Sequence, residues 1–178
     1  SAKNVVLELL RRVSVKGGVG KVFEYGGSGI ATLNVTERSI ITNMGTETGA
    51  TSSLFPSDEI TKQWFRAQGR EDQWLPLTAD EDAIYDEVIE IDLSQVEPLI
   101  ALPHQPDNVV TIKEVAGKPV DQVVIGSCAN SSLQDILAIA ELLRGKAVHP
   151  HVDVGLYIGS KQVYLESIAR GALADIIR

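Results

Sequence analysis

The last third of the chain alternates between strand-like and helix-like sequence, and this alternation limits the folds available to it. Residues 121–125 predict a strand, and residues 131–144 predict a helix whose apolar residues recur at helical spacing. A second strand is predicted over residues 152–158, followed by a helix with Ser160 as its N-cap. Such alternation with short connections is typical of βαβ units. We therefore expect an α/β fold with mainly parallel sheets covered by helices on both faces, a three-layer α/β/α arrangement.

The earlier part of the chain gives a weaker form of the same pattern. We expect the 131–144 helix to begin with a capping box of Ser131 and Gln134. Further helices are predicted over residues 4–13 with Asn4 as N-cap, from a Thr36 cap toward Gly49, and after an Asp58 cap. Further strands are predicted over residues 21–25, 51–55 and 87–93, the last from its period-two alternation.

A proline-rich stretch separates the two halves. Residues 99–120 contain Pro103, Pro106 and Pro119 and few helix signals, which is typical of a linker. We expect two α/β lobes, residues 1–108 and residues 109–178, the second of them truncated. The chain starts without methionine and ends within an apolar periodic segment, so we expect it to be part of a longer protein.

Composition excludes several classes of protein. Apolar residues make up 44% of the chain and charged residues 22%, which is ordinary for a globular protein. The net charge of −8 argues against binding to nucleic acid or an anionic membrane surface. No apolar stretch approaches the ~20 residues of a membrane span. Because the one cysteine cannot form an internal disulfide, we expect a reducing, cytoplasmic location.

That one cysteine, Cys128, lies in the stretch GSCANSSLQD (126–135), after the predicted strand and before the predicted helix. Ligands in doubly wound folds bind at the carboxyl ends of parallel strands. A helix N-terminus there stabilises a thiolate. A lone cysteine is also often a small buried apolar residue. The residue pattern alone leaves both interpretations open.

Other candidate residues carry less information. Asn43 and Glu47 are four residues apart and therefore share a helix face, although exposure at a helix end explains them equally well. The stretch GGVGK (17–21) lacks the first glycine and the hydroxyl residue of a phosphate-binding loop, which favours a simple turn. His149 and His151 lie in a predicted loop without supporting ligands, so we interpret them as solvated.

Two long motifs give the chain a family resemblance. SIITNMGTETGATSSLFPSDE (39–59) and GSCANSSLQD (126–135) are similar to the two corresponding motifs of the aconitase family of iron–sulfur hydro-lyases. Shorter matches follow in the same order and extend the resemblance over nearly the whole chain: EYGGSGI (24–30), YDEVIEIDLSQVEP (85–98) and GSKQ (159–162).

The resemblance implies a fold of the aconitase iron–sulfur domain type and a specific chemistry. The family holds a [4Fe–4S] cluster through three cysteines and leaves one iron open to substrate as a Lewis acid. By the motif match, Cys128 would be the first cluster ligand and Glu47 would act at the iron-bound water or hydroxyl. Asn43 would donate hydrogen bonds near the cluster, and Asn130 and Ser131 would line the cluster or substrate environment.

The resemblance also implies what this chain lacks. The second and third cysteine ligands of the family have no counterpart among the residues after Cys128. We therefore expect the isolated chain to bind no cluster and to be inactive. Its expected partners are the remaining domains of the parent chain and a small tricarboxylic acid, without nucleic acid or membrane.

The substrate is predicted from the wording of the motifs. Two stretches are more similar to aconitase than to 3-isopropylmalate dehydratase: Gly45 to Ser52, and Asn-Ser-Ser after Cys128. Aconitase interconverts citrate and isocitrate through cis-aconitate in the tricarboxylic acid cycle. Aconitate hydratase is therefore the first interpretation. Homoaconitase, the large subunit of 3-isopropylmalate dehydratase and a non-catalytic binding module on the same scaffold are the alternatives.

Overall fold

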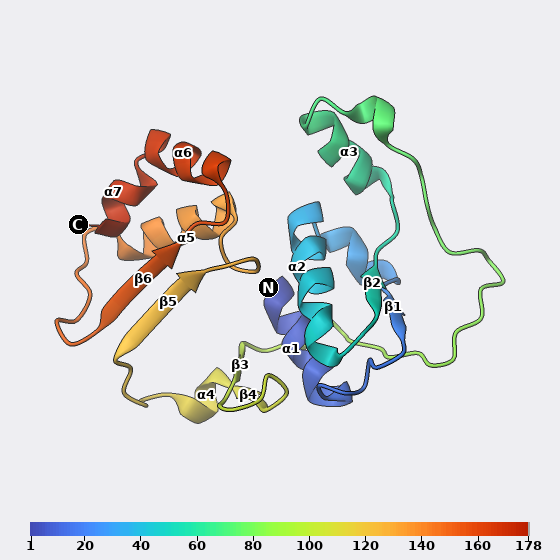
Figure 1. Cartoon of the computed structure of the whole chain (residues 1–178), viewed down its shortest axis with the longest axis horizontal. Coiled ribbons are helices and arrows are strands. Elements are labelled where there is room, and N and C mark those ends of the chain that lie inside the picture. The colour runs from blue at the N-terminus through green and yellow to red at the C-terminus, as the bar shows by residue number, and fades with distance from the viewer. Residues whose placement is uncertain (178) are drawn as a thin grey trace. The chain divides into compact units, whose positions relative to one another are not determined.

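The computed structural model describes residues 1–177, which form two compact units, Ser1–Ala116 and a second that starts at Gly117 (Figure 1). The first unit contains, in chain order, α1 (Ala2–Val13), β1 (Val22–Glu24), η1 (Ser28–Thr32), α2 (Val35–Gly45), η2 (Thr46–Thr48), β2 (Ser52–Leu54), α3 (Glu59–Ala67), η3 (Glu71–Gln73), β3 (Leu99–Ala101), β4 (Val109–Thr111) and α4 (Ile112–Val115). The second contains β5 (Gln122–Gly126), α5 (Leu133–Leu143), β6 (Asp153–Tyr157), α6 (Lys161–Ala169) and α7 (Ala172–Ile177).

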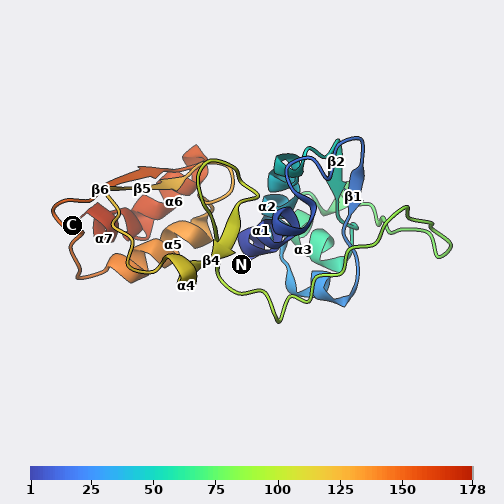
Figure 2. The ribbon, with the colours of Figure 1, turned by 90° about the horizontal axis from the view of Figure 1, so that it is seen from below.

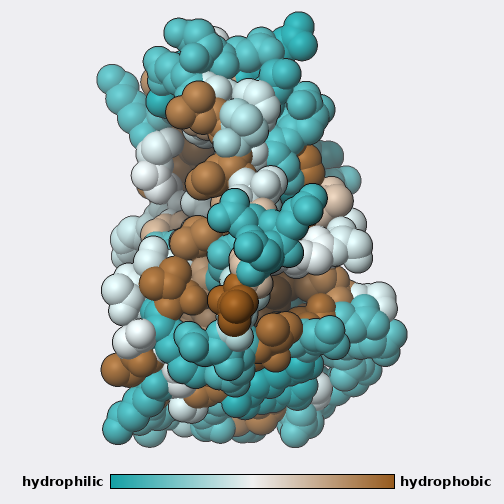
Figure 3. All heavy atoms as spheres, turned by 90° about the vertical axis from the view of Figure 1, so that its right-hand side faces the viewer, coloured by the Kyte–Doolittle hydropathy of each residue, from teal (hydrophilic) through white to brown (hydrophobic). Residues whose placement is uncertain are grey.

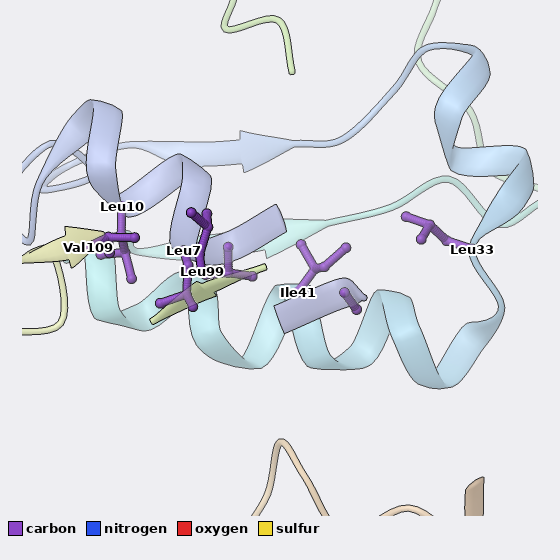
Figure 4. Close-up of a cluster of buried hydrophobic side chains, with 8 residues drawn as sticks. Leu7, Leu10, Leu33, Ile41, Leu99 and Val109 are labelled. Carbon is purple, nitrogen blue, oxygen red and sulfur yellow. The ribbon is translucent and has the colours of Figure 1, made fainter. Parts of the chain in front are cut away.

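The core of the first unit lies where α1 packs against α2 and the β3–β4 pair (Figure 4). The helical spacing of apolar residues in α1 places Val6 and Leu10 on one buried face, and Ile41 of α2 meets them there. β1 and β2 are parallel and flank α2 in sequence, which makes a small βαβ unit. β3 and β4 are antiparallel, and Val109 of β4 is part of this core. Residues 109–116, which the sequence analysis placed in the second lobe, therefore pack in the first unit.

The second unit is a βαβ unit with two further helices. β5 and β6 are parallel over five paired positions, from Gln122↔Asp153 to Gly126↔Tyr157. The three helices lie on one face of this pair (Figure 2), where Ile136 and Ala140 of α5 form a buried core with residues of α7. On the opposite face Val124 and Tyr157 are exposed. Because two of the three sheets within residues 1–177 are parallel, the predicted α/β class with mainly parallel sheets is confirmed.

Side-chain caps set the starts of several helices. Asp58 accepts a hydrogen bond from the Thr61 amide and Ser160 accepts one from the Val163 amide, so both predicted caps are confirmed. Three other predicted starts are wrong. α2 is capped by Asn34, which forms a reciprocal capping box with Glu37. α5 is capped by Ser132, which does the same with Asp135, and α1 starts at Ala2 rather than after Asn4.

The strand predicted over residues 87–93 is also wrong. The segment between Trp74 and Leu99 contains no strand and forms a long loop at the edge of the first unit (Figure 1). Its alternating apolar residues find no neighbouring strand to accept and donate backbone hydrogen bonds, and Val88 is exposed. One backbone carbonyl of this segment, that of Glu90, instead accepts a hydrogen bond from the Arg12 guanidinium.

The face of the first unit that carries α3 and this loop exposes apolar side chains between polar ones (Figure 3). The large exposed apolar residues of α3 and the loop are Trp64, Leu75, Leu77, Ile84, Tyr85 and Val88. Within residues 1–177, no helix has both the length and the apolar character that crossing a lipid bilayer requires.

Candidate functional site

Cys128 lies on a sharp turn at the carboxyl end of β5, and its side chain is exposed. The two residues that precede it, Gly126 and Ser127, have unusual backbone conformations. Gly126 has φ +139°, and a Cβ atom there would overlap the carbonyl of Tyr157 on the neighbouring strand, so only glycine fits. Ser127 has φ +71°, in the left-handed region that non-glycine residues seldom adopt. The chain therefore leaves the sheet abruptly and presents the sulfur outward.

Hydrogen bonds within the turn hold this conformation. The Ser127 hydroxyl lies 3.5 Å from Cys128 Sγ and donates to it. The Ser131 hydroxyl is buried and donates to the backbone carbonyl of Ser127. Asn130, between them, is half-buried. Ser132 then caps α5, so the turn leads directly into the N-terminus of a helix, where backbone N–H groups favour negative charge.

Asn43 and Glu47 lie in the first unit, where α2 ends. Asn43 is on α2 and Glu47 on η2, and both are exposed. This helix end is fixed by packing. A Cβ atom on Gly45 would overlap the Ser53 hydroxyl of β2, and the buried Thr48 hydroxyl donates to the Gly45 carbonyl at 2.7 Å. Gly45 and Thr48 of this motif therefore have structural roles.

The structure thus groups the predicted site residues into two sets. Cys128, Asn130 and Ser131 share the turn after β5 in the second unit, and Asn43 and Glu47 share one helix end in the first. Each set is brought together by local chain geometry. The roles predicted for these residues stay predictions.

The structure gives no sign of a functional role for the two histidines or for the GGVGK turn. His149 and His151 are exposed in the loop before β6, with ring centroids 5.4 Å apart. Within the described residues, no group of three or more His, Cys, Asp or Glu side chains is arranged to hold a metal ion. The GGVGK turn packs against η2, where the Gly18 amide donates to the Thr48 carbonyl at 2.9 Å.

Sequence reasoning missed two residues that shape the Cys128 turn. Ser127 was not singled out, although its left-handed conformation sets the direction of the turn. Gly159 follows β6, and a Cβ atom there would overlap the Ser131 hydroxyl. The only sequence signal for either residue was its place in the short stretches GSC and GSK.

The donor set of this chain fits one corner of an iron–sulfur cluster. An exposed thiol on a constrained turn suits a single iron, because thiolates are the usual ligands of such clusters. A cubane cluster takes further thiolates, and this chain has one cysteine. The residues present therefore fit as part of a ligand set.

The fold and this turn define an α/β protein that presents an exposed cysteine side chain at the carboxyl end of a parallel strand. The chain belongs to the aconitase family: the family model described as aconitase family (aconitate hydratase) matches residues 1–118 and 113–178. The predicted family resemblance is thereby confirmed.

Three relatives of this chain are named as large subunits of 3-isopropylmalate dehydratase. The chain is 40% identical over 174 residues to 3-isopropylmalate dehydratase large subunit 2 of Rubrobacter xylanophilus, which covers 97% of this chain and 41% of that protein. It is 39% identical over 180 residues to large subunit 1 of the same enzyme from Thermotoga maritima, covering 99% and 43%. It is 38% identical over 178 residues to the large subunit from Caldanaerobacter subterraneus, covering 100% and 42%. The chain thus spans about two-fifths of the length of the curated relatives it matches.

These relatives support the 3-isopropylmalate alternative better than the citrate–isocitrate interpretation and its place in the tricarboxylic acid cycle. Part of the 45–52 motif is fixed by packing within the first unit. Gly45 and Thr48 are buried and hold the end of α2 against its neighbours. Such residues report on packing rather than on the molecule that is bound.

Proposed function

We propose that the full-length protein to which this chain belongs is a [4Fe–4S]-dependent hydro-lyase that acts on 3-isopropylmalate, with Cys128 as one cluster ligand. The observation that carries this proposal is the exposed Cys128 sulfur on the turn after β5, in a chain 40% identical to a 3-isopropylmalate dehydratase large subunit. The relatives are named large subunits, so the expected protein partner is a separate small subunit, in addition to the rest of the large subunit.

Cys128 would hold one iron of the cluster through its thiolate, and the other thiolates would come from the remainder of the full-length protein. When bound, the cluster supplies an open iron that acts as a Lewis acid on a substrate hydroxyl. Ser131 would fix the backbone that carries the Cys128 sulfur, because its hydroxyl donates to the carbonyl of Ser127 within the same turn. Asn130 would line the cluster or substrate environment beside it.

Glu47 and Asn43 would act on the substrate side. Glu47 carries an exposed carboxylate on η2, which can exchange a proton with the hydroxyl that leaves or returns. Asn43, one turn earlier on α2, offers both an amide donor and a carbonyl acceptor to orient the oxygens around that carboxylate. The packing of Gly45 and Thr48 would keep this helix end in place during the reaction.

The proposal is tested in the full-length protein reconstituted with iron and sulfide and combined with its small subunit. Cys128→Ser should lower bound iron and sulfide and abolish the visible absorbance of the cluster. Glu47→Gln should retain the cluster and lose most of the turnover, followed by the ultraviolet absorbance of the alkene product. Glu59→Gln, which changes another exposed carboxylate in the first unit, is the matched control and should alter neither reading. Full cluster content in Cys128→Ser would overturn the proposal.

The citrate–isocitrate reaction remains the second candidate, because the matching family model is described as aconitate hydratase. The same reconstituted protein distinguishes the two when kcat/KM is compared on 3-isopropylmalate and on citrate. The proposed function requires 3-isopropylmalate to be the better substrate, and a preference for citrate would reverse the assignment.

A further inference from the structure

Ser131 is the most buried polar residue of the Cys128 turn, with 7% of its surface exposed. Its hydroxyl donates to the carbonyl of Ser127, the residue directly before the cysteine. Ser127 itself is in the left-handed region at φ +71°, a conformation that a non-glycine residue keeps only where its surroundings hold it. The Ser131 bond is one such restraint, and it acts on the peptide group that joins Ser127 to Cys128.

Gly159, just after the neighbouring strand β6, lies against the Ser131 side chain. A Cβ atom at position 159 would overlap the Ser131 hydroxyl, yet it would lie 3.5 Å from Ser131 Cβ and 3.6 Å from the Ser127 carbonyl oxygen, which are ordinary contacts. Gly159 is absent from the glycines with positive φ, so its backbone does not require glycine. Glycine is needed at this position for space, and that space is filled by the Ser131 hydroxyl.

We propose that Ser131 and Gly159 are a pair of positioning residues that fix the Cys128 sulfur for metal ligation. The end of β6 holds Ser131 in place, Ser131 holds the Ser127 carbonyl, and the Ser127 conformation directs the sulfur. The role in metal ligation rests on the proposed function, whereas the mechanical coupling between positions 131, 159 and 128 can be measured without a cluster.

The coupling is measured by the alkylation rate of Cys128 with iodoacetamide at one fixed pH in the 178-residue chain, where Cys128 is the only thiol. Ser131→Ala should raise the rate about fivefold, because the loss of one hydrogen bond releases the turn. Gly159→Ala should raise it at least as much, because the new methyl group displaces the Ser131 hydroxyl. The double variant should match Ser131→Ala alone, because the added Cβ atom then meets only a methyl group at an ordinary distance.

Ser167→Ala is the matched control. Ser167 is fully buried, and its hydroxyl, like that of Ser131, donates to the carbonyl four residues earlier, that of Val163, at 2.6 Å within α6. Its removal should lower stability to a similar degree and leave the alkylation rate of Cys128 unchanged. A Ser131→Ala rate equal to that of wild type or of Ser167→Ala would overturn the proposal, as would additive effects in the double variant.

Circular dichroism separates a loosened turn from an unfolded chain. Should Gly159→Ala fail to fold, the pair predicts that adding Ser131→Ala restores the fold, and a double variant that also fails to fold would refute the pairing. In the full-length protein, Ser131→Ala should lose iron in air several-fold faster than Ser167→Ala. Equal iron loss in these two variants overturns the positioning role with the function intact, whereas a wild-type protein that takes up no cluster overturns the function itself.

Discussion

Removing the charge of Asp58 tests how much one partly buried ion pair stabilises the first unit. The Arg38 side chain is 5% exposed and binds Asp58 at both ends of its carboxylate, with Nη2–Oδ2 at 2.7 Å and Nη1–Oδ1 at 2.8 Å. The same guanidinium donates to the carbonyls of Leu33 and Ile30, both at 3.1 Å. It therefore ties α2 to the start of α3 and to the turn before α2.

Asp58→Asn removes the negative charge but keeps a side-chain oxygen that can still cap α3. Removing one member of a fully buried ion pair lowers the free energy of unfolding by about 3–5 kcal/mol, because the other charge is left without a partner. The Asp58 side chain is 30% exposed, and three backbone carbonyls, those of Leu33, Ile30 and Pro56, remain bonded to the guanidinium, so a smaller loss is expected here. We expect the free energy of unfolding to fall by about 2 kcal/mol. Asp58→Ala also removes the cap and should cost about 1 kcal/mol more.

The assay is urea unfolding followed by tryptophan fluorescence, because both tryptophans, Trp64 and Trp74, lie in the first unit. Glu87→Gln is the matched control. The Lys21–Glu87 pair has the same 2.7 Å separation, but its side chains are 49% and 57% exposed. Exposed pairs contribute about 0–1 kcal/mol, so this variant should unfold close to wild type. Equal losses in Asp58→Asn and Glu87→Gln would refute the argument from burial.

The pH dependence gives a second check of the same pair. The hydrogen bonds from Arg38 hold the pKa of Asp58 below its ordinary value of 3.8. A carboxyl group whose pKa is lower in the folded state stabilises the fold above the unfolded pKa and loses this effect as the pH falls through the folded pKa. The difference between wild type and Asp58→Asn should therefore be constant at neutral pH and shrink as the pH falls below 3.8. A difference that persists undiminished at strongly acidic pH would show that the charge is not its origin.

Three further predictions concern the fold and are checked by the same fluorescence assay. Ser14, after α1, has φ 64° and ψ 178°, a conformation that suits glycine, so Ser14→Gly should stabilise the first unit by about 1 kcal/mol; a lower urea midpoint would contradict the strain. Asn34→Ala should cost about 1 kcal/mol through loss of the α2 capping box, and Asn34→Ser should restore most of it. Leu10→Ala should cost about 3 kcal/mol because Leu10 is fully buried, whereas Leu75→Ala, at an exposed position, should change the midpoint little; similar losses at both would refute the assignment of the core.

Much of the fold could be read from local sequence. The buried faces of α1 and α5, the strands β5 and β6, and the caps at Asp58 and Ser160 all follow from patterns within a few residues. Periodicity of this kind is a local property, because which side of a helix is apolar depends only on residues three and four apart. The position of Cys128 on the turn between β5 and α5 followed from the same reasoning.

Two of the errors occurred where the outcome depends on residues far apart in the chain. The alternation of residues 87–93 was read as a strand, but a strand also needs a partner for its backbone hydrogen bonds, and the fold supplies none there. The cap of α5 is Ser132 rather than Ser131, because the Ser131 hydroxyl is used by the Ser127 carbonyl and lies beneath Gly159.

The sequence by itself determined that a thiol follows a parallel strand and precedes a helix, together with the family in which this occurs. Only the tertiary structure decided how that thiol is held. Ser131 and Gly159 are 28 positions apart in the chain, and they meet because β5 and β6 pair in parallel, which brings their carboxyl ends to the same edge of the sheet. A contact of that kind depends on the register of two strands, which no local pattern specifies.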